Sequence, residues 1–171
     1  STGLARNAVI PRLPELLATK NKRINIAPDI ITADLTRLKA ALDKGPGDHM
    51  LLIGRRHIRD MNSWLHNLNN YARGKNRCTL LINPQDAQRI GLTAEGMARI
   101  TSRVGEFKAE VAITDSIMPG VVSLPHGFGH NYKDTQQSIA SGTTPGISAN
   151  DLVDDNEMDL PSGTSVVNGV P

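Results

Sequence analysis

Short apolar runs separated by turn residues make up most of the chain from residue 48 onward. Residues 107–114 alternate apolar and polar positions, which predicts a strand with one buried face. Other short runs bounded by Gly, Pro, Asn or Ser predict further strands. The predicted strands cover residues 50–53, 78–82, 97–103, 107–114, 121–124 and 164–167. Many short strands, tight turns and a few short helices favour a mainly β (α+β) fold that closes into a barrel.

Residues 1–47 have the pattern of a helical connector that precedes this domain. Thr32 is the predicted N-cap of a helix over residues 33–44, and Gly45 ends that helix. One face of the helix carries three leucines: Leu35, Leu38 and Leu42. The break Gly45-Pro46-Gly47 places the start of the main domain at residue 48, so we predict a domain over residues 48–171.

Local signals define further elements inside the main domain. The pair Asn83-Pro84 predicts a helix N-terminus, and Gly91 ends the predicted helix over residues 84–90. A tight turn at residues 104–106 predicts a hairpin between the strands on either side of it. Residues 131–149 are rich in Ser, Thr, Gly and Gln, which is typical of a mobile surface loop.

The segment after the first predicted strand has an unusual composition. Between Gly54 and Asn67 it contains three arginines, two histidines, two asparagines, a serine and the only tryptophan. Guanidinium groups form paired hydrogen bonds with phosphate oxygens, and Asn and Ser side chains can bind the edge of a heterocycle. Ordinary surface turns do not need this combination. The segment therefore predicts a large anionic ligand that contains a heterocycle.

Composition excludes several classes of site. Cys78 is the single cysteine, so the chain has no internal disulfide and no cysteine-based zinc or iron–sulfur site. The apolar run that Cys78 opens favours a buried thiol. No apolar run approaches the roughly 20 residues that span a bilayer. His126 and His130 are separated by glycines and do not predict a metal pair.

Charge is distributed unevenly along the chain. Residues 1–108 carry 18 Lys/Arg and 9 Asp/Glu, whereas residues 109–171 carry 1 and 8. The two parts can neutralise each other on folding, and the basic residues lack the aromatic-interleaved pattern of RNA-binding modules. The sequence therefore does not predict a nucleic-acid surface.

Six short motifs occur in an order that resembles a known domain. They are Ile53-Gly54-Arg55-Arg56-His57, Asn62-Ser63-Trp64-Leu65-His66-Asn67, Asn83-Pro84-Gln85-Asp86-Ala87 with Gly91-Leu92 and Gly96, Thr101-Ser102-Arg103-Val104-Gly105, Met118-Pro119-Gly120-Val121-Val122-Ser123-Leu124-Pro125-His126-Gly127, and Asn150-Asp151-Leu152-Val153-Asp154. With these motifs, residues 48–171 resemble the carboxy-terminal molybdopterin-dinucleotide-binding domain of the molybdenum oxidoreductase superfamily. That superfamily includes dimethyl sulfoxide reductase, formate dehydrogenase and periplasmic nitrate reductase. Residues 24–44 resemble the segment that leads into this domain.

The resemblance implies a fold, a cofactor and partners. The implied fold is a six-stranded double-psi β-barrel. The implied cofactor is bis(molybdopterin guanine dinucleotide) with Mo or W, held jointly with amino-terminal catalytic domains of the same parent polypeptide. An electron-transfer subunit is a second implied partner, whereas nucleic acid and membrane are not implied. The cofactor-binding residues carried over from the family are Gly54, Arg55, Arg56, His57, Asn62, Ser63, Trp64, His126, Gly127, Phe128 and Asn150.

Structural explanations compete with these ligand roles. Adjacent side chains need not point the same way, so at most one of Arg55 and Arg56 is expected to reach the phosphates. His66 has the competing role of a satisfied core histidine. Asn62 and Ser63 are candidate caps of a short helix over residues 64–67, and Asn150 is a candidate for an Asx-turn.

Our leading hypothesis is a cofactor-binding domain that holds the dinucleotide and covers the active site of a molybdenum- or tungsten-dependent oxidoreductase. No acid–base pair and no nucleophile with a partner stands out, so we expect no turnover from this chain alone. The alternative is a double-psi barrel interaction module with a vestigial ligand site, whose partner surface is residues 131–149 and the acidic run 151–159. The cytoplasm is favoured as the compartment, with the periplasm as the second possibility, because any export signal would lie upstream of Ser1.

Overall fold

Five short strands form one mixed sheet in the computed structural model, which describes residues 11–45, 47–94 and 96–169. The strands are β1 (Leu51–Arg55), β2 (Thr79–Ile82), β3 (Met97–Thr101), β4 (Glu106–Ile113) and β5 (Val121–Pro125), and their order in the sheet is β1-β5-β2-β4-β3. The fold is therefore mainly sheet with short helices, as the sequence predicts. The chain divides into two compact units, Ser1–Ala41 and Leu42–Pro171, and the whole sheet belongs to the second unit.

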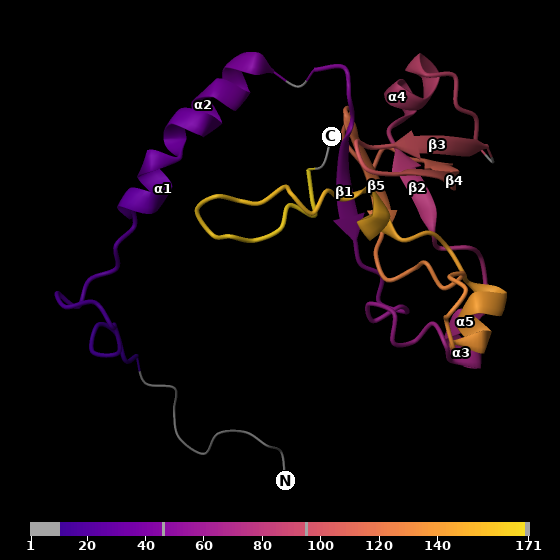
Figure 1. Cartoon of the computed structure of the whole chain (residues 1–171), viewed down its shortest axis with the longest axis horizontal. Coiled ribbons are helices and arrows are strands. Elements are labelled where there is room, and N and C mark those ends of the chain that lie inside the picture. The colour runs from indigo at the N-terminus through magenta and orange to yellow at the C-terminus, as the bar shows by residue number, and fades with distance from the viewer. Residues whose placement is uncertain (1–10, 46, 95, 170–171) are drawn as a thin grey trace, which may run out of the picture. The chain divides into compact units, whose positions relative to one another are not determined.

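Parallel and antiparallel pairs alternate across this sheet. β1 runs parallel to β5 with Leu51 opposite Val121, and β2 runs parallel to β4 with Thr79 opposite Glu110. β5 and β2 are antiparallel, and β3 and β4 form the predicted antiparallel hairpin. The parallel β1–β5 pair brings the carboxyl ends of both strands to the same edge of the sheet. The segments that follow these two strands therefore start side by side (Figure 1).

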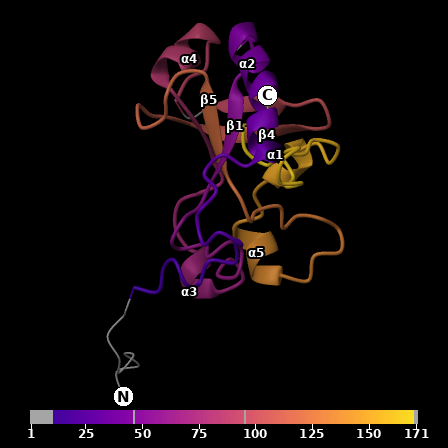
Figure 2. The same cartoon turned by 90° about the vertical axis from the view of Figure 1, so that its left-hand side faces the viewer.

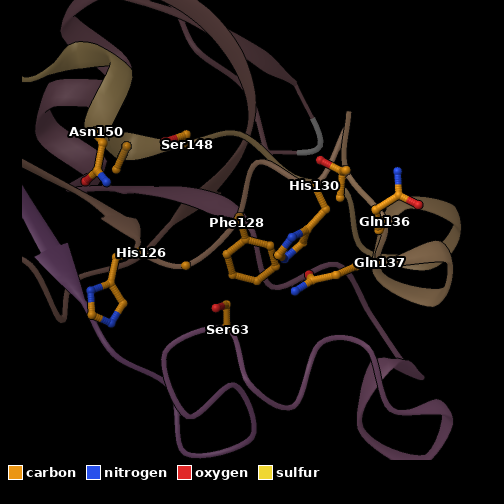
Figure 3. Close-up of a pocket in the computed structure, with 11 residues that line it drawn as sticks. Ser63, His126, Phe128, His130, Gln136, Gln137, Ser148 and Asn150 are labelled. Carbon is orange, nitrogen blue, oxygen red and sulfur yellow. The ribbon is translucent and has the colours of Figure 1, made fainter. Parts of the chain in front are cut away.

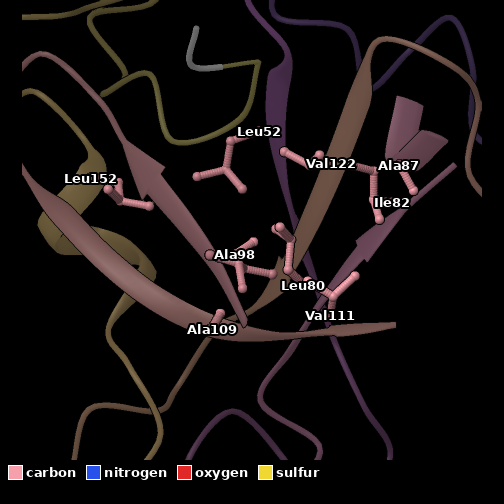
Figure 4. Close-up of a cluster of buried hydrophobic side chains, with 10 residues drawn as sticks. Leu52, Leu80, Ile82, Ala87, Ala98, Ala109, Val111, Val122 and Leu152 are labelled. Carbon is pink, nitrogen blue, oxygen red and sulfur yellow. The ribbon is translucent and has the colours of Figure 1, made fainter. Parts of the chain in front are cut away.

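The hydrophobic core lies between the sheet and the elements packed on it. It consists of small and medium apolar side chains: Leu52, Leu80, Ile82, Ala87, Ala98, Ala109, Val111, Val122, Leu124 and Leu152 (Figure 4). Leu124 and Ile82 are almost completely buried, and burial of each side chain contributes about 1.5–3 kcal/mol. Cys78 is also buried and free, which confirms the expected environment of its thiol.

Helix α4 (Pro84–Arg89) forms where the Asn83-Pro84 pair predicts it. The Asn83 side chain accepts a hydrogen bond of 2.9 Å from the Gln85 N–H, and Pro84 occupies the first turn. Gly91 follows with φ of +72°, a left-handed conformation that ends the helix at low cost. The predicted helix is therefore confirmed: α4 begins at Pro84 as predicted and ends one residue before the predicted Ile90.

The other helices are α1 (Asp29–Ala33), α2 (Leu35–Lys44), α3 (Asn69–Ala72), α5 (Ser138–Thr143) and the 3₁₀ helix η1 (Ala149–Leu152). In the second unit, α3 and α5 pack together at one end of the sheet and α4 lies at the opposite end (Figure 1 and Figure 2). The helix α5 interrupts residues 131–149, which we predicted as an irregular loop. Its Ala140 is completely buried, so apolar packing holds this segment in place.

In the connector, the predicted N-cap at Thr32 is wrong. Thr32 lies inside α1, and its hydroxyl donates to the carbonyl of Asp29 at 3.1 Å instead of capping the next helix. The helical region breaks at Asp34, and α2 begins at Leu35. Gly45 ends α2 as predicted, with φ of +73°. The first ten residues of the connector and Pro46 lie outside the described residues.

Three strand predictions need correction. The strand predicted over residues 97–103 ends earlier, because β3 stops at Thr101. Residues 164–167 do not form a strand, because only Ser165 pairs, in an isolated bridge with Met158. β1 does not end at Ile53 but continues through Gly54 and Arg55, which pair with Leu124 and Pro125. Gly54 and Arg55 therefore belong to the sheet and not to the loop that follows it.

Candidate functional site

A pocket of about 590 Å³ opens between the segments that follow β1 and β5 (Figure 3). Its lining residues are Ser63, His126, Gly127, Phe128, His130, Thr135, Gln136, Gln137, Ser148, Ala149 and Asn150. Ser63 comes from the first of these segments, and all the others come from the second. The pocket therefore exists because the parallel pairing of β1 with β5 starts both segments at the same edge of the sheet.

Five of the residues predicted to bind the cofactor line this pocket. They are Ser63, His126, Gly127, Phe128 and Asn150. A sixth, Gly54, lines an adjoining pocket of about 140 Å³ that shares His126, Ala149 and Asn150 with the first. Asn150 lies in η1, and its side chain forms no Asx-turn among the described hydrogen bonds. The structure thus brings together residues from both predicted segments.

The remaining predicted residues lie outside the lining. Arg56, His57, Asn62 and Trp64 are on the exposed surface of the segment after β1, and the Trp64 side chain is 76% exposed. Nδ1 of His57 accepts a hydrogen bond of 3.1 Å from the Arg59 N–H. Residues 64–67 form successive turns and not a helix, so Asn62 and Ser63 cap no helix there.

The base of the pocket depends on a close approach between two backbone segments. Gly127 has φ of +88°, and a Cβ added there would lie 2.7 Å from the carbonyl carbon of Asn62 and closer still to its oxygen. Asn62 and Met61 also have positive φ, of 62° and 45°. Glycine at position 127 is therefore required both by its backbone conformation and by the space that the turn at Asn62 occupies.

Arg55 acts as a clamp within the sheet. Its Nη1 donates to the carbonyl of Ser123 at 2.6 Å, and its Nη2 donates to the carbonyl of Thr79 at 2.6 Å. Burial lowers the pKa of Arg55, which is half-buried among these carbonyls. The guanidinium therefore joins β1, β5 and β2 where they meet. Its neighbour Arg56 is exposed, so the two side chains do point in different directions.

A buried polar cluster, formed by Asp60, Arg77, His66 and His130, lies against the pocket wall. Arg77 Nη2 and Nε lie 2.6 and 2.8 Å from Oδ1 of Asp60, which is 2% exposed. Nε2 of the completely buried His66 lies 3.2 Å from the same oxygen. Nδ1 of His66 is 2.7 Å from Nε2 of His130.

The two histidines of this cluster resist protonation. Burial lowers the pKa of His66, and its contact with Asp60 offsets only part of that effect. Burial also lowers the pKa of His130, and the neighbouring His66 lowers it further. The ring of Phe128 packs against His66 with centroids 4.4 Å apart. Of the two predicted explanations of His66, the structural one fits its position, whereas His130 also faces the pocket.

Sequence reasoning missed the cluster and part of the pocket. Asp60 and Arg77 are 17 residues apart, and no local pattern indicates that they pair. Thr135, Gln136 and Gln137 also line the pocket, although the sequence places them only in a polar surface segment. The polar composition of that segment was the available signal, because amide side chains beside a predicted ligand loop are candidates for heterocycle binding.

Electrostatically, the pocket is neutral. Among the described residues that line it there is no Lys, Arg, Asp or Glu, while amide, hydroxyl and imidazole groups are frequent. Nε2 of His126 is buried and has no hydrogen-bond partner among the described residues. A buried polar atom without a partner carries a desolvation cost that a ligand could remove. Such a lining suits the edges of a heterocycle better than a phosphate group.

Residues 50–171 match the family model described as Molydopterin dinucleotide binding domain. The chain belongs to this family. The match covers more than half of the chain and confirms the resemblance that the six motifs carry. The chain is accordingly a molybdopterin dinucleotide-binding domain, a kind of domain found in molybdenum-dependent oxidoreductases.

Two curated relatives are parts of larger enzymes. One is a tetrathionate reductase polypeptide of Salmonella typhimurium, 32% identical over 106 residues, which are 53% of this chain and 10% of that protein. The other is the molybdopterin-containing polypeptide of arsenate respiratory reductase from Chrysiogenes arsenatis, 30% identical over 69 residues, which are 37% of this chain and 8% of that protein. The chain thus spans about a tenth of the length of these relatives or less.

A solved structure supports the fold of the domain. Acetylene hydratase from Pelobacter acetylenicus superposes with a TM-score of 0.59 at 16% identity, covering 80% of this chain and 19% of that one. At this identity the likeness concerns the fold alone. Among the described residues, no helix is long and apolar enough to cross a membrane, and no three His, Cys, Asp or Glu side chains gather as a metal site.

Proposed function

We propose that the pocket binds the guanine nucleotide part of a bis(molybdopterin guanine dinucleotide) cofactor, within a larger molybdenum- or tungsten-dependent oxidoreductase. The observation that carries this proposal is the meeting of Ser63 with His126, Gly127, Phe128 and Asn150 around one pocket. These residues come from two segments that are about 60 positions apart in the chain, and both were singled out by their sequence motifs.

The properties of the pocket fit a heterocycle and its sugar. Its volume of about 590 Å³ lies within the range of about 300–1,000 Å³ that is usual for small-molecule sites. Phe128 supplies an apolar wall, while Gln136, Gln137 and Asn150 supply donors and acceptors. The unpartnered Nε2 of His126 supplies a further polar contact. The residues present therefore fit the nucleoside portion of the cofactor.

The phosphates would lie outside this neutral lining. Arg55 is engaged by backbone carbonyls, so we assign phosphate contact to the exposed Arg56. Gly54 in the adjoining pocket allows a ligand to approach the backbone closely. When bound, the metal of the cofactor would transfer an oxygen atom or an electron pair. This chain holds the dinucleotide and keeps water from it, and other domains of the parent supply the remaining contacts.

We further propose that the domain closes as a six-stranded double-psi barrel. The described sheet has five strands, and the segment near the carboxyl end already approaches the free edge of β1. There the Gly169 N–H donates to the carbonyl of Leu52 at 2.8 Å, and the Gly54 N–H donates to Asn168 at 2.6 Å. A short sixth strand at this edge is what the barrel requires.

An NMR titration of the chain with GMP, GDP and AMP tests this function. We expect amide shifts to cluster at residue 63 and over residues 126–150, with guanine nucleotides binding more tightly than AMP. Gln137→Ala should weaken GMP binding, whereas the matched control Gln88→Ala, at an exposed position of α4, should not. Equal binding of AMP and GMP, or no shifts at millimolar ligand in a folded spectrum, would reject the proposal for this pocket.

One observation favours the interaction module as a second candidate. Three apolar side chains on the segment after β1 are strongly exposed: Ile58 at 92%, Met61 at 58% and Trp64 at 76%. Exposed apolar groups within one short segment fit a surface that another protein or domain covers. For an interaction module, Trp64→Ala would abolish partner capture while Gln137→Ala would leave it intact.

A further inference from the structure

The carboxylate of Asp60 determines which ring nitrogen of each histidine in the buried polar cluster carries the hydrogen. Asp60 is paired with Arg77 and is therefore a carboxylate, which can only accept hydrogen bonds. The nitrogen of His66 that faces this carboxylate is Nε2, at 3.2 Å. Nε2 forms no regular hydrogen bond with a described residue, so its attraction to the carboxylate is mainly electrostatic. The negative oxygen still favours an N–H over a lone pair at that nitrogen.

This assignment continues to the next ring. Burial keeps both histidines neutral, and a neutral imidazole has one donor nitrogen and one acceptor nitrogen. With its hydrogen on Nε2, His66 must accept at Nδ1. The partner at that atom is Nε2 of His130, 2.7 Å away, so His130 must donate there. The single ring hydrogen of neutral His130 therefore lies on Nε2, in the hydrogen bond to His66.

The other nitrogen of His130 is left as an acceptor beside the pocket. Among the described residues, no hydrogen bond accompanies Nδ1 of His130, and the ring belongs to the pocket lining next to Phe128 and Gln137 (Figure 3). The Ser141 hydroxyl donates to the backbone carbonyl of His130 at 2.6 Å, and the His130 N–H donates to the carbonyl of Pro145 at 2.8 Å. The two backbone hydrogen bonds of His130 and the contact at its Nε2 therefore both fix the position of the ring.

We propose that Asp60 and His66 fix His130 as a specificity-determining hydrogen-bond acceptor, which selects an N–H or O–H group of the ligand in this pocket. A bare nitrogen repels phosphate oxygens and attracts donors, in keeping with the neutral lining. The N1–H and 2-amino group of guanine form such a donor edge, and a pterin ring presents the same edge. A ribose hydroxyl is the other source of a donor. The ligand contact rests on the function proposed above, whereas the tautomer of His130 does not.

Nitrogen-15 NMR of the imidazole rings in the 171-residue chain tests the tautomer without any ligand. We expect His130 to carry its hydrogen on Nε2 and none on Nδ1, and His66 to show the same pattern. Exposed His49 serves as the internal reference, because it contacts neither the cluster nor the pocket. A hydrogen on Nδ1 of His130 would overturn the proposal, and this measurement needs no variant.

Titrations with GMP, IMP and 2′-deoxy-GMP then identify the donor. IMP lacks the 2-amino group, and 2′-deoxy-GMP lacks one ribose hydroxyl. We expect GMP to shift the His130 Nδ1 signal. Loss of that shift with IMP would identify the 2-amino group as the donor, and loss with 2′-deoxy-GMP would identify the 2′-hydroxyl. A shift that both analogues keep and AMP loses would identify N1–H. His130→Leu should weaken GMP binding about three- to tenfold, the value of one neutral hydrogen bond, and should not weaken binding of the analogue that lacks the donor.

The outcomes separate this proposal from the one on function. GMP that shifts Ser63 and Asn150 but leaves Nδ1 of His130 unchanged would overturn the acceptor role while the pocket's function stands. GMP that shifts no pocket residue would overturn the function, and the expected tautomer would then still support His130 as a fixed acceptor.

Discussion

Replacing Gly127 with alanine probes the contact that closes the base of the pocket. The substitution carries two separate costs. An L-residue at φ of +88° is strained by about 1–2 kcal/mol. The new Cβ would also meet the backbone of Asn62, with its carbonyl carbon only 2.7 Å away, and such overpacking costs about 1–3 kcal/mol more. We therefore expect Gly127→Ala to lower the free energy of unfolding by about 2–5 kcal/mol.

Gly120→Ala is the matched control for this experiment. Gly120 has nearly the same conformation, with φ of +80°, but an added Cβ would meet no atom within 4 Å. It should therefore lose only the conformational part, about 1–2 kcal/mol. Urea unfolding measures both variants, and a difference of about 2 kcal/mol would separate their midpoints by about 1 M at a slope of about 2 kcal/mol/M. Equal losses in the two variants would refute the steric argument at Asn62.

Three further predictions concern the clamp, the buried cluster and the helix α4. Arg55→Ala should destabilise the fold by about 2–4 kcal/mol, because it removes the hydrogen bonds that the guanidinium donates to the carbonyls of Ser123 and Thr79. Arg56→Ala should change stability by less than about 0.5 kcal/mol, because its side chain is exposed. Thermal unfolding compares the two variants, and similar losses would contradict the clamp. Stability should fall as pH drops below 6.5, because folding lowers the pKa of His66 and His130, so the unfolded chain binds more protons in that range. Urea unfolding between about pH 7.5 and 5.5 should show a slope of up to about 1.4 kcal/mol per pH unit for each extra proton, and a flat profile would mean that the rings are not protected. Asn83→Ala should cost about 1–2 kcal/mol in chemical unfolding, since Asn83 caps α4 and also donates to the carbonyl of Ile117 at 2.7 Å; no loss would show that the cap is dispensable.

Local rules predicted the elements whose ends are set by their own residues. Asn83, Pro84 and Gly91 define α4 because each acts on the backbone of its own turn. The prediction of an N-cap at Thr32 was wrong because a threonine hydroxyl can form either of two local hydrogen bonds with the backbone. Its hydroxyl can bond backward to a carbonyl of the preceding turn as well as forward to an N–H, and α1 extends far enough to offer one.

Long-range features could not be predicted from local pattern. Residues 164–167 have the composition of a strand, but only Ser165 pairs, because strand formation depends on the edge available to it. The resemblance indicated Ser63, His126 and Asn150 without giving their geometry, and the structure adds that they share a pocket. The pairing of Asp60 with Arg77 and that of His130 with His66 had no local signal, since the partners in each pair are distant in the sequence.

The parallel pairing of β1 with β5 places most residues of the hydrophobic core and the residues that select the ligand in different parts of the chain. Most core side chains lie on the strands, with Ala87 in α4 and Leu152 in η1 as the exceptions, while the pocket side chains lie on the two segments that leave the carboxyl ends of this pair. Insertions and substitutions in those segments can alter which ligand fits without changing strand register. Among related chains, the number of residues between these two segments can therefore vary. The residues that line the pocket can also change while the sheet stays the same.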